Sequence, residues 1–148
     1  MATLAQPIPT TASVSRTTAR APIVALGRLF FVLVFLVTGP GLFSSQTIAY
    51  AASQGVPLAA IAVPFAGVVA IVGAISILLG YHARIGAWLL VLFLVPVTLS
   101  LHKFWMVSDP TMHQMQFVNF VKNVSLLGGA LLISQIGAGP WSLDERRK

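Results

Sequence analysis

Four long apolar stretches, joined by short polar segments, decide what this chain can fold into. They cover about residues 22–43, 56–79, 85–105 and 116–136. Roughly 20 apolar residues in a helix cross the hydrocarbon core of a bilayer, which is about 30 Å thick. The sequence therefore predicts an all-α integral membrane protein, a four-helix bundle of antiparallel transmembrane helices.

The composition leaves little of the chain for a soluble domain. Charged residues make up 8% of the 148 residues and hydrophobic residues 57%, with a mean hydropathy of +0.90. Residues 1–21 are rich in Ala, Thr, Ser and Pro and are predicted to be a disordered tail. Residues 22–140 then form the membrane domain and 141–148 a charged tail. The net charge is +6, but the basic residues are dispersed at span ends, so nucleic-acid binding is not expected.

The basic residues also predict the orientation, because Lys and Arg near span ends stay on the cytoplasmic side. One predicted side holds Arg16, Arg20, Arg28, Arg84, Arg146, Arg147 and Lys148, and the other holds only Lys103 and Lys122. We therefore expect a multi-pass protein of the bacterial cytoplasmic (inner) membrane, with both termini cytoplasmic.

Two targeting signals are alternatives for the start of the chain. Ala49-Tyr50-Ala51 fits the cleavage pattern of a signal peptide, but the preceding apolar run is too long for one. The acid-free amino terminus resembles a mitochondrial transit peptide but lacks an amphipathic period.

Small residues in the second span predict close helix packing. Ala62, Ala66, Ala70 and Ala74 recur every fourth residue, which lets a neighbouring backbone approach. The turn at residues 80–84 is so short that the second and third spans must be antiparallel neighbours.

Polar side chains gather where the third and fourth spans reach the outer side. At 100° per residue, His102 shares a face with Thr98 and Trp105 on the third span. The fourth span carries one polar stripe, consisting of Gln116, Asn119, Lys122 and Asn123. Because a charge or amide facing lipid is unfavourable, we expect Asn119, Lys122 and Asn123 to point into the bundle toward His102.

This polar cluster suits a quinone headgroup, with His102 and Lys122 as the candidate catalytic residues. His102 would exchange protons and Lys122 would stabilise charge on the reduced ring. The candidate ligand-binding residues are Gln116, Asn119, Asn123, Trp105 and Phe120. The alternative is structural: amides often form hydrogen bonds between membrane helices, and Lys near a span end extends to the headgroups.

Metal or haem binding is not expected. The chain has no cysteine, and His82 lies in the predicted cytoplasmic turn, on the opposite side from His102. On that cytoplasmic side Arg84 and Asp144 both flank span ends. We predict that they form an ion pair that fixes helix register more than it adds stability.

Several short elements, in this order along the chain, resemble the DoxX family of small four-helix bacterial membrane proteins. They are Arg28 with Gly39-Pro40-Gly41, the turn at residues 79–84, His102 with Phe104, the stretch 119–123 running into Gly128-Gly129, and the ending at residues 139–144. The resemblance implies a four-helix subunit of a membrane thiosulfate:quinone oxidoreductase or quinol oxidase system, with a redox partner protein or a homo-oligomer. Similar proteins often carry Glu where this chain has Ala70, so a carboxylate proton relay is not available in the spans.

Two functions follow from the sequence. The first is a quinone-interacting subunit of a membrane redox system, which leaves open whether this chain is itself an enzyme. The second is a non-catalytic membrane anchor or assembly subunit for partner proteins. Transport of a small apolar solute ranks behind both, because no inverted repeat is evident.

Overall fold

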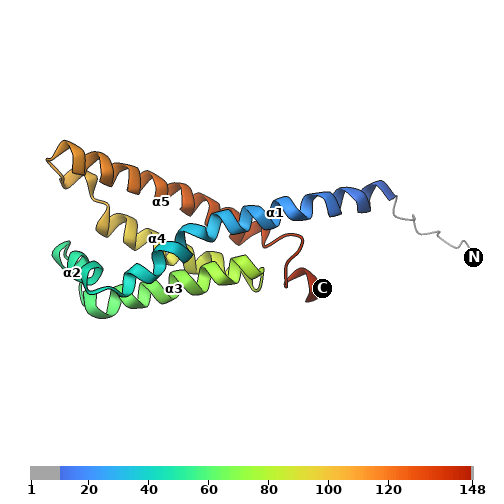
Figure 1. Cartoon of the computed structure of the whole chain (residues 1–148), viewed down its shortest axis with the longest axis horizontal. Coiled ribbons are helices and arrows are strands. Elements are labelled where there is room, and N and C mark those ends of the chain that lie inside the picture. Colours follow the sequence, from blue (N-terminus) through green and yellow to red (C-terminus); the bar gives the residue numbers. More distant parts are fainter. Residues whose placement is uncertain (1–10, 148) are drawn as a thin grey trace, which may run out of the picture.

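The computed structural model describes residues 11–147, and the side chains of residues 21–146. Its elements are α1 (Thr11–Thr38), the 3-10 helix η1 (Gly39–Phe43), α2 (Ser45–Ser53), α3 (Ala59–Leu79), α4 (Ala83–Leu101), the 3-10 helix η2 (Phe104–Met106), α5 (Pro110–Ile136) and the 3-10 helix η3 (Glu145–Arg147) (Figure 1). The spans in α1, α3, α4 and α5 are long and apolar enough to cross a membrane. The predicted fold class, an all-α membrane protein with four transmembrane helices, is confirmed.

The two helices of the α3–α4 hairpin pack with their backbones in close contact. A methyl group added to Gly73 of α3 would lie 2.8 Å from the carbonyl oxygen of Gly86 on α4, so the two backbones nearly touch. The hairpin turns through Gly80, whose positive φ of 62° favours glycine. The prediction that these two spans are antiparallel neighbours is therefore confirmed. We call Ala62, Ala66, Ala70 and Ala74 the alanine series. Of these, Ala70 and Ala74 are buried in this contact region.

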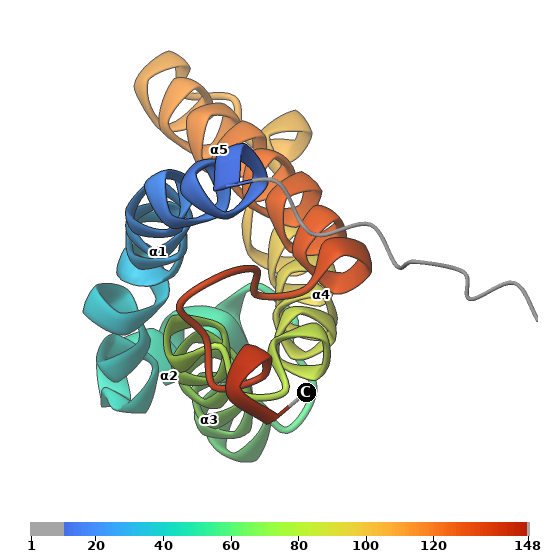
Figure 2. The same cartoon turned by 90° about the vertical axis from the view of Figure 1, so that its right-hand side faces the viewer.

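The two remaining long helices cover opposite sides of the hairpin, and the end-on view shows the four together (Figure 2). α1 packs on α3 and α5 packs on α4. Nine buried residues form the shared core: Val32, Phe35, Ala70, Ala74, Ile77, Ala87, Leu90, Leu94 and Ala130. Below, "the His82 end" is the end of the bundle with the α3–α4 turn, and "the His102 end" is the opposite end, with α2 and η2.

The short helix α2 occupies the segment 44–55, for which the sequence predicts a polar loop. Ser44 begins it, since its side chain accepts a hydrogen bond from the Thr47 amide at 3.2 Å. Ala51 is fully buried and packs with Ala59 and Val63 of α3. Nine residues are too few for a stable isolated helix, so α2 depends on this packing, which the polar sequence does not reveal.

Parts of both predicted tails have a defined fold in the structure. Residues 1–10 lie outside the described residues, but 11–21 continue α1 as helix, because a membrane helix already supplies the costly first turn. The carboxyl-terminal segment is also folded. The Leu143 and Asp144 amides donate to the Leu79 and Gly80 carbonyls at 3.3 and 2.7 Å, which holds this segment on the α3–α4 turn.

Two span boundaries also shift at the His102 end. α4 ends at Leu101, and α5 starts at Pro110, six residues before its predicted start. The Asp109 carboxylate caps α5 by accepting from the Met112 amide at 2.8 Å.

Candidate functional site: an apolar cavity beside three polar side chains

A chain of three polar side chains joins α2, α4 and α5 at the His102 end. His102 Nδ1 donates to Gln116 Oε1 at 2.8 Å, and Gln116 Nε2 donates to the Tyr50 hydroxyl at 3.0 Å. The Tyr50 hydroxyl in turn lies 3.5 Å from the Leu101 carbonyl oxygen, to which it donates. We call Tyr50, Gln116 and His102 the polar chain. The structure thus brings two of the predicted site residues together and adds Tyr50, which lies on the helix that the sequence does not predict.

The other predicted polar residues of α5 do not join the polar chain. Asn123 points into the bundle and is only 7% exposed, but no hydrogen bond links it to His102. Asn119 is half-buried, and Lys122 is exposed, with its amine donating to Asn119 Oδ1 at 3.1 Å. The prediction that Lys122 points inward is therefore wrong. Since α5 packs mainly on one neighbour, α4, only a narrow strip of its surface is covered.

Trp105 and Phe120, two of the predicted ligand-binding residues, contact other aromatic rings instead of the polar chain. The Phe104 ring lies at the centre, with centroids 5.1 Å from Trp105 and 5.3 Å from Phe120, all edge to face. His113 and Phe117 contact the same ring at 5.6 and 5.3 Å. These contacts pack η2 against α5 and position the end of α4.

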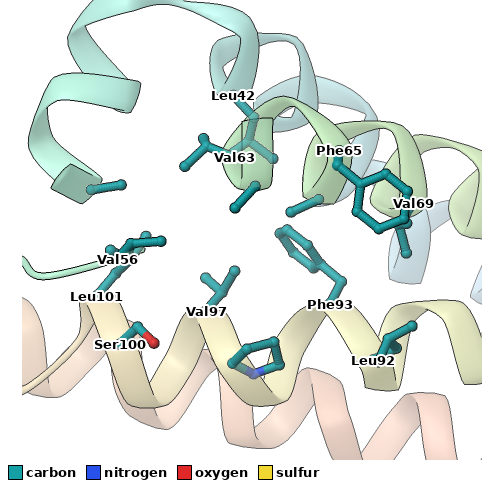
Figure 3. Close-up of a pocket in the computed structure, with 14 residues that line it drawn as sticks. Leu42, Val56, Val63, Phe65, Val69, Leu92, Phe93, Val97, Ser100 and Leu101 are labelled. Carbon is teal, nitrogen blue, oxygen red and sulfur yellow. The ribbon is translucent and has the colours of Figure 1, made fainter. Parts of the chain in front are cut away.

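An apolar cavity of about 290 Å³ lies between α2, α3 and α4 (Figure 3). Val63 and Val97 face each other across it. Phe65 and Leu92 are 64% and 61% exposed and also line it, so the cavity reaches the lipid-facing surface between α3 and α4. An apolar cavity of about 150 Å³ already holds a benzene molecule. The lining residues are Leu42, Ala51, Val56, Ala62, Val63, Phe65, Ala66, Val69, Leu92, Phe93, Pro96, Val97, Ser100 and Leu101.

The polar chain lies next to this cavity, at the His102 end of the bundle. Leu101 lines the cavity with its side chain and accepts the Tyr50 hydroxyl with its carbonyl, and Ala51 beside Tyr50 lines it too. Lys103 donates to the Gln54 carbonyl at 3.3 Å and ties the end of α4 to α2. The side chains of the polar chain do not line the cavity themselves, but they lie next to the lining residues Ala51 and Leu101. Polar groups beside an apolar space are an arrangement that fits an amphipathic ligand.

The alanine series is the sequence signal that could have indicated the cavity. Near the His82 end, Ala70 and Ala74 pack against other helices. Ala62 and Ala66 instead line the cavity. Small side chains predict close contact, but they leave a void where the neighbouring helices stand further away. The sequence alone does not distinguish these two outcomes.

At the His82 end the Asp144 carboxylate caps α4. Its two oxygens accept from the His82 and Ala83 amides at 2.7 and 3.0 Å. An acid at this position is favourable because the first amides of a helix have no partner within the helix. The contacts shown are therefore to the first turn of α4, and the ion pair with Arg84 stays a prediction.

Arg28 of α1 holds the carboxyl-terminal segment from inside the bundle. It is 6% exposed, and its Nη2 donates to the Trp141 carbonyl at 2.6 Å. Its Nε and Nη1 atoms are buried without a hydrogen-bond partner among the described residues. Any side chain at Gly80 would collide with Arg28 and with Ser142, so glycine is required there for a second reason. Within residues 11–147, no three His, Cys, Asp or Glu side chains are placed to hold a metal.

The fold and the cavity define a multi-pass helical membrane protein with a ligand-sized apolar site that opens toward lipid. The chain belongs to the SURF4 family, whose sequence model matches residues 56–148, from the start of α3 to the carboxyl terminus. It is 34% identical over 131 residues to the inner membrane protein YphA of Escherichia coli, covering 86% of this chain and 92% of YphA. It is 31% identical over 84 residues to the ER-derived vesicles protein ERV29 of Saccharomyces cerevisiae, covering 57% of this chain and 27% of ERV29. No solved structure matches the chain significantly.

The resemblance to the DoxX family is wrong, because the family shown is SURF4. The predicted function as a quinone-linked redox subunit is therefore also wrong. The structure explains why the short elements mislead: Arg28, the turn at residues 79–84 and Asp144 all close the His82 end of the bundle. They therefore report on how four helices are held together and not on any redox chemistry.

Proposed function

We propose that this SURF4-family protein binds an amphipathic molecule that enters from the bilayer. The apolar chain of the ligand occupies the cavity, and its polar group contacts the polar chain of Tyr50, Gln116 and His102. The observation that carries the proposal is a cavity of about 290 Å³ with an apolar lining, apart from Ser100, that opens toward lipid, with the polar chain next to its lining residues Ala51 and Leu101.

Physical chemistry assigns different roles to the two parts of the site. Moving an alkyl chain from lipid into an apolar cavity gains little hydrophobic free energy, because lipid tails are as apolar as Leu. Filling an empty cavity does gain dispersion contacts. Selectivity must then come from hydrogen bonds to the polar group, which Tyr50, Gln116 and His102 can donate or accept.

We also propose that the protein resides in a bacterial cytoplasmic membrane with both termini on the cytoplasmic side. The similarity to an inner membrane protein and the asymmetric distribution of Lys and Arg support this location. ERV29 is by name a protein of ER-derived vesicles, and the match covers only 27% of its length. Binding of a membrane-borne molecule is compatible with both settings.

The test is lipid binding by variants that fill the cavity. Ala66→Leu adds a larger side chain to the cavity wall, whereas Ala60→Leu makes the same change on an exposed position of the same helix. The delipidated full-length protein is titrated with phosphatidylethanolamine and with oleic acid, and retained ligand is counted by native mass spectrometry. We expect Ala66→Leu to weaken binding of at least one probe about tenfold and Ala60→Leu to leave it unchanged. Equal binding by both variants would contradict the proposal.

A further inference from the structure

Lys122 is a charged residue on the exposed surface of a membrane-crossing helix. It lies twelve residues after the start of α5 at Pro110 and fourteen before its end at Ile136. At about 1.5 Å per residue it is roughly 18 and 21 Å from the two helix ends. Even if the membrane boundary is drawn at the buried Gln116, the Lys122 backbone lies about 9 Å inside. A charge at this depth is rare in membrane helices and normally has a partner.

α1 covers the side of α5 that carries Lys122 near Gly129 but no longer covers it toward the His102 end. Gly129, two helical turns along the same face, touches α1: a methyl group there would lie 2.7 Å from the Phe31 ring. Beyond this contact α1 and α5 diverge toward the His102 end (Figures 1 and 2). Val118 is 53% exposed, and Ser125 is exposed beside Lys122. We call Val118, Lys122 and Ser125 the Lys122 strip.

Among the side chains of residues 21–146, the partner of Lys122 is a neutral one. The contact shown for its amine is the Asn119 carbonyl oxygen, at 3.1 Å. The whole sequence contains three acidic residues, Asp109, Asp144 and Glu145, and none of them lies inside a span. A second copy of this chain therefore cannot offer a carboxylate at the depth of Lys122.

We propose that the Lys122 strip is the docking surface for a transmembrane helix of another protein that carries a single Asp or Glu at matching depth. The attraction between opposite charges is strongest in a medium of low dielectric constant. Both charges are already in the membrane before they meet. The carboxylate replaces lipid beside the ammonium group, and the partner helix covers the side of α5 that α1 leaves open. This site is separate from the cavity between α2, α3 and α4, so the two proposals fail independently.

Synthetic transmembrane peptides test this inference directly. The full-length protein and a leucine-rich 24-residue peptide carry a donor and an acceptor dye in phosphatidylcholine vesicles at pH 8, and energy transfer reports association. Three peptides differ at one position, which is placed at the depth of Lys122 and is Glu, Gln or Leu. We expect the Glu peptide to associate at least tenfold more tightly than the Gln peptide, and a Glu moved two turns along the peptide to lose this advantage.

Variants of the lysine complete the test. Lys122→Met should abolish the preference for Glu, and Lys122→Glu should transfer the preference to a peptide with Lys at that position, which a misfolded variant would not do. Arg146→Met, at an exposed position outside the spans, should behave as the unchanged protein. Equal association of the three peptides would overturn the proposal. So would a Lys122 effect confined to vesicles with added phosphatidylglycerol, since the lysine would then only contact lipid headgroups.

Discussion

Replacing Asp144 should destabilise the bundle, because one carboxylate closes the first turn of α4. In Asp144→Ala the His82 and Ala83 amides lose their acceptors at 2.7 and 3.0 Å. Loss of a helix cap costs about 0.5 to 2 kcal/mol, and hydrogen bonds to a charged group contribute about 1.5 to 3 kcal/mol each when buried. His82 is exposed, so water replaces part of what is lost. We therefore expect a loss of about 1 to 2 kcal/mol in unfolding free energy.

Two further variants separate the hydrogen bonds from the charge. Asp144→Asn keeps one carbonyl oxygen and should cost about half as much as alanine, about 0.5 to 1 kcal/mol. Glu145→Ala is the matched control, because this neighbouring acid accepts a single exposed hydrogen bond, from the Trp141 amide at 3.0 Å. Its effect should stay within about 0.5 kcal/mol.

Unfolding in mixed dodecylmaltoside and sodium dodecyl sulfate micelles, followed by far-UV circular dichroism, measures these differences. The expected order of stability is Glu145→Ala, then Asp144→Asn, then Asp144→Ala. An Asp144→Ala protein as stable as Glu145→Ala would refute the capping role. An Asn variant as unstable as the Ala variant would show that the charge carries the effect and not the geometry of the two bonds.

Three other outcomes are expected, two from the structure and one from the distribution of Lys and Arg. Gly73→Leu should cost about 2 kcal/mol or more, because its added atoms meet the α4 backbone, whereas Gly128→Leu, with open space around it, should change the unfolding midpoint little. Tyr50→Phe removes the hydroxyl from the polar chain and should cost about 1 kcal/mol in the same assay, with the helical signal of the folded state unchanged. Reporter fusions after Lys148 and after Ser53 should be active on the cytoplasmic and the opposite side, respectively, and the reverse result would refute the predicted orientation.

The sequence predicts the four spans well because each is long and almost purely apolar, and membrane crossing depends on little else. It also predicts the α3–α4 contact, because Gly73 and the nearby alanines leave no bulk between the helices. Helix α2 is missed for the opposite reason: its stability comes from the burial of Ala51 against α3 and not from its own pattern.

The candidate site is predicted less completely than the fold. Helical spacing brings His102 and Gln116 to one depth, and the structure joins them. The spacing cannot show that α1 diverges from α5, which leaves Lys122 exposed. The cost of exposing a charge to lipid predicts that the charge finds a partner, but it does not predict that the partner belongs to the same chain.

The two ends of the bundle are held together by different kinds of contact. At the His82 end Arg28 fastens α1 to the carboxyl-terminal segment, and Asp144 fastens that segment to α4. At the His102 end the polar chain joins α2, α4 and α5, while apolar contacts pack Ala51 of α2 on α3 and the Phe104 ring on α5. A movement of the helices at the His82 end would break the hydrogen bonds of Arg28 and Asp144, so we expect that any widening of the cavity for a larger ligand shifts the helices at the His102 end instead.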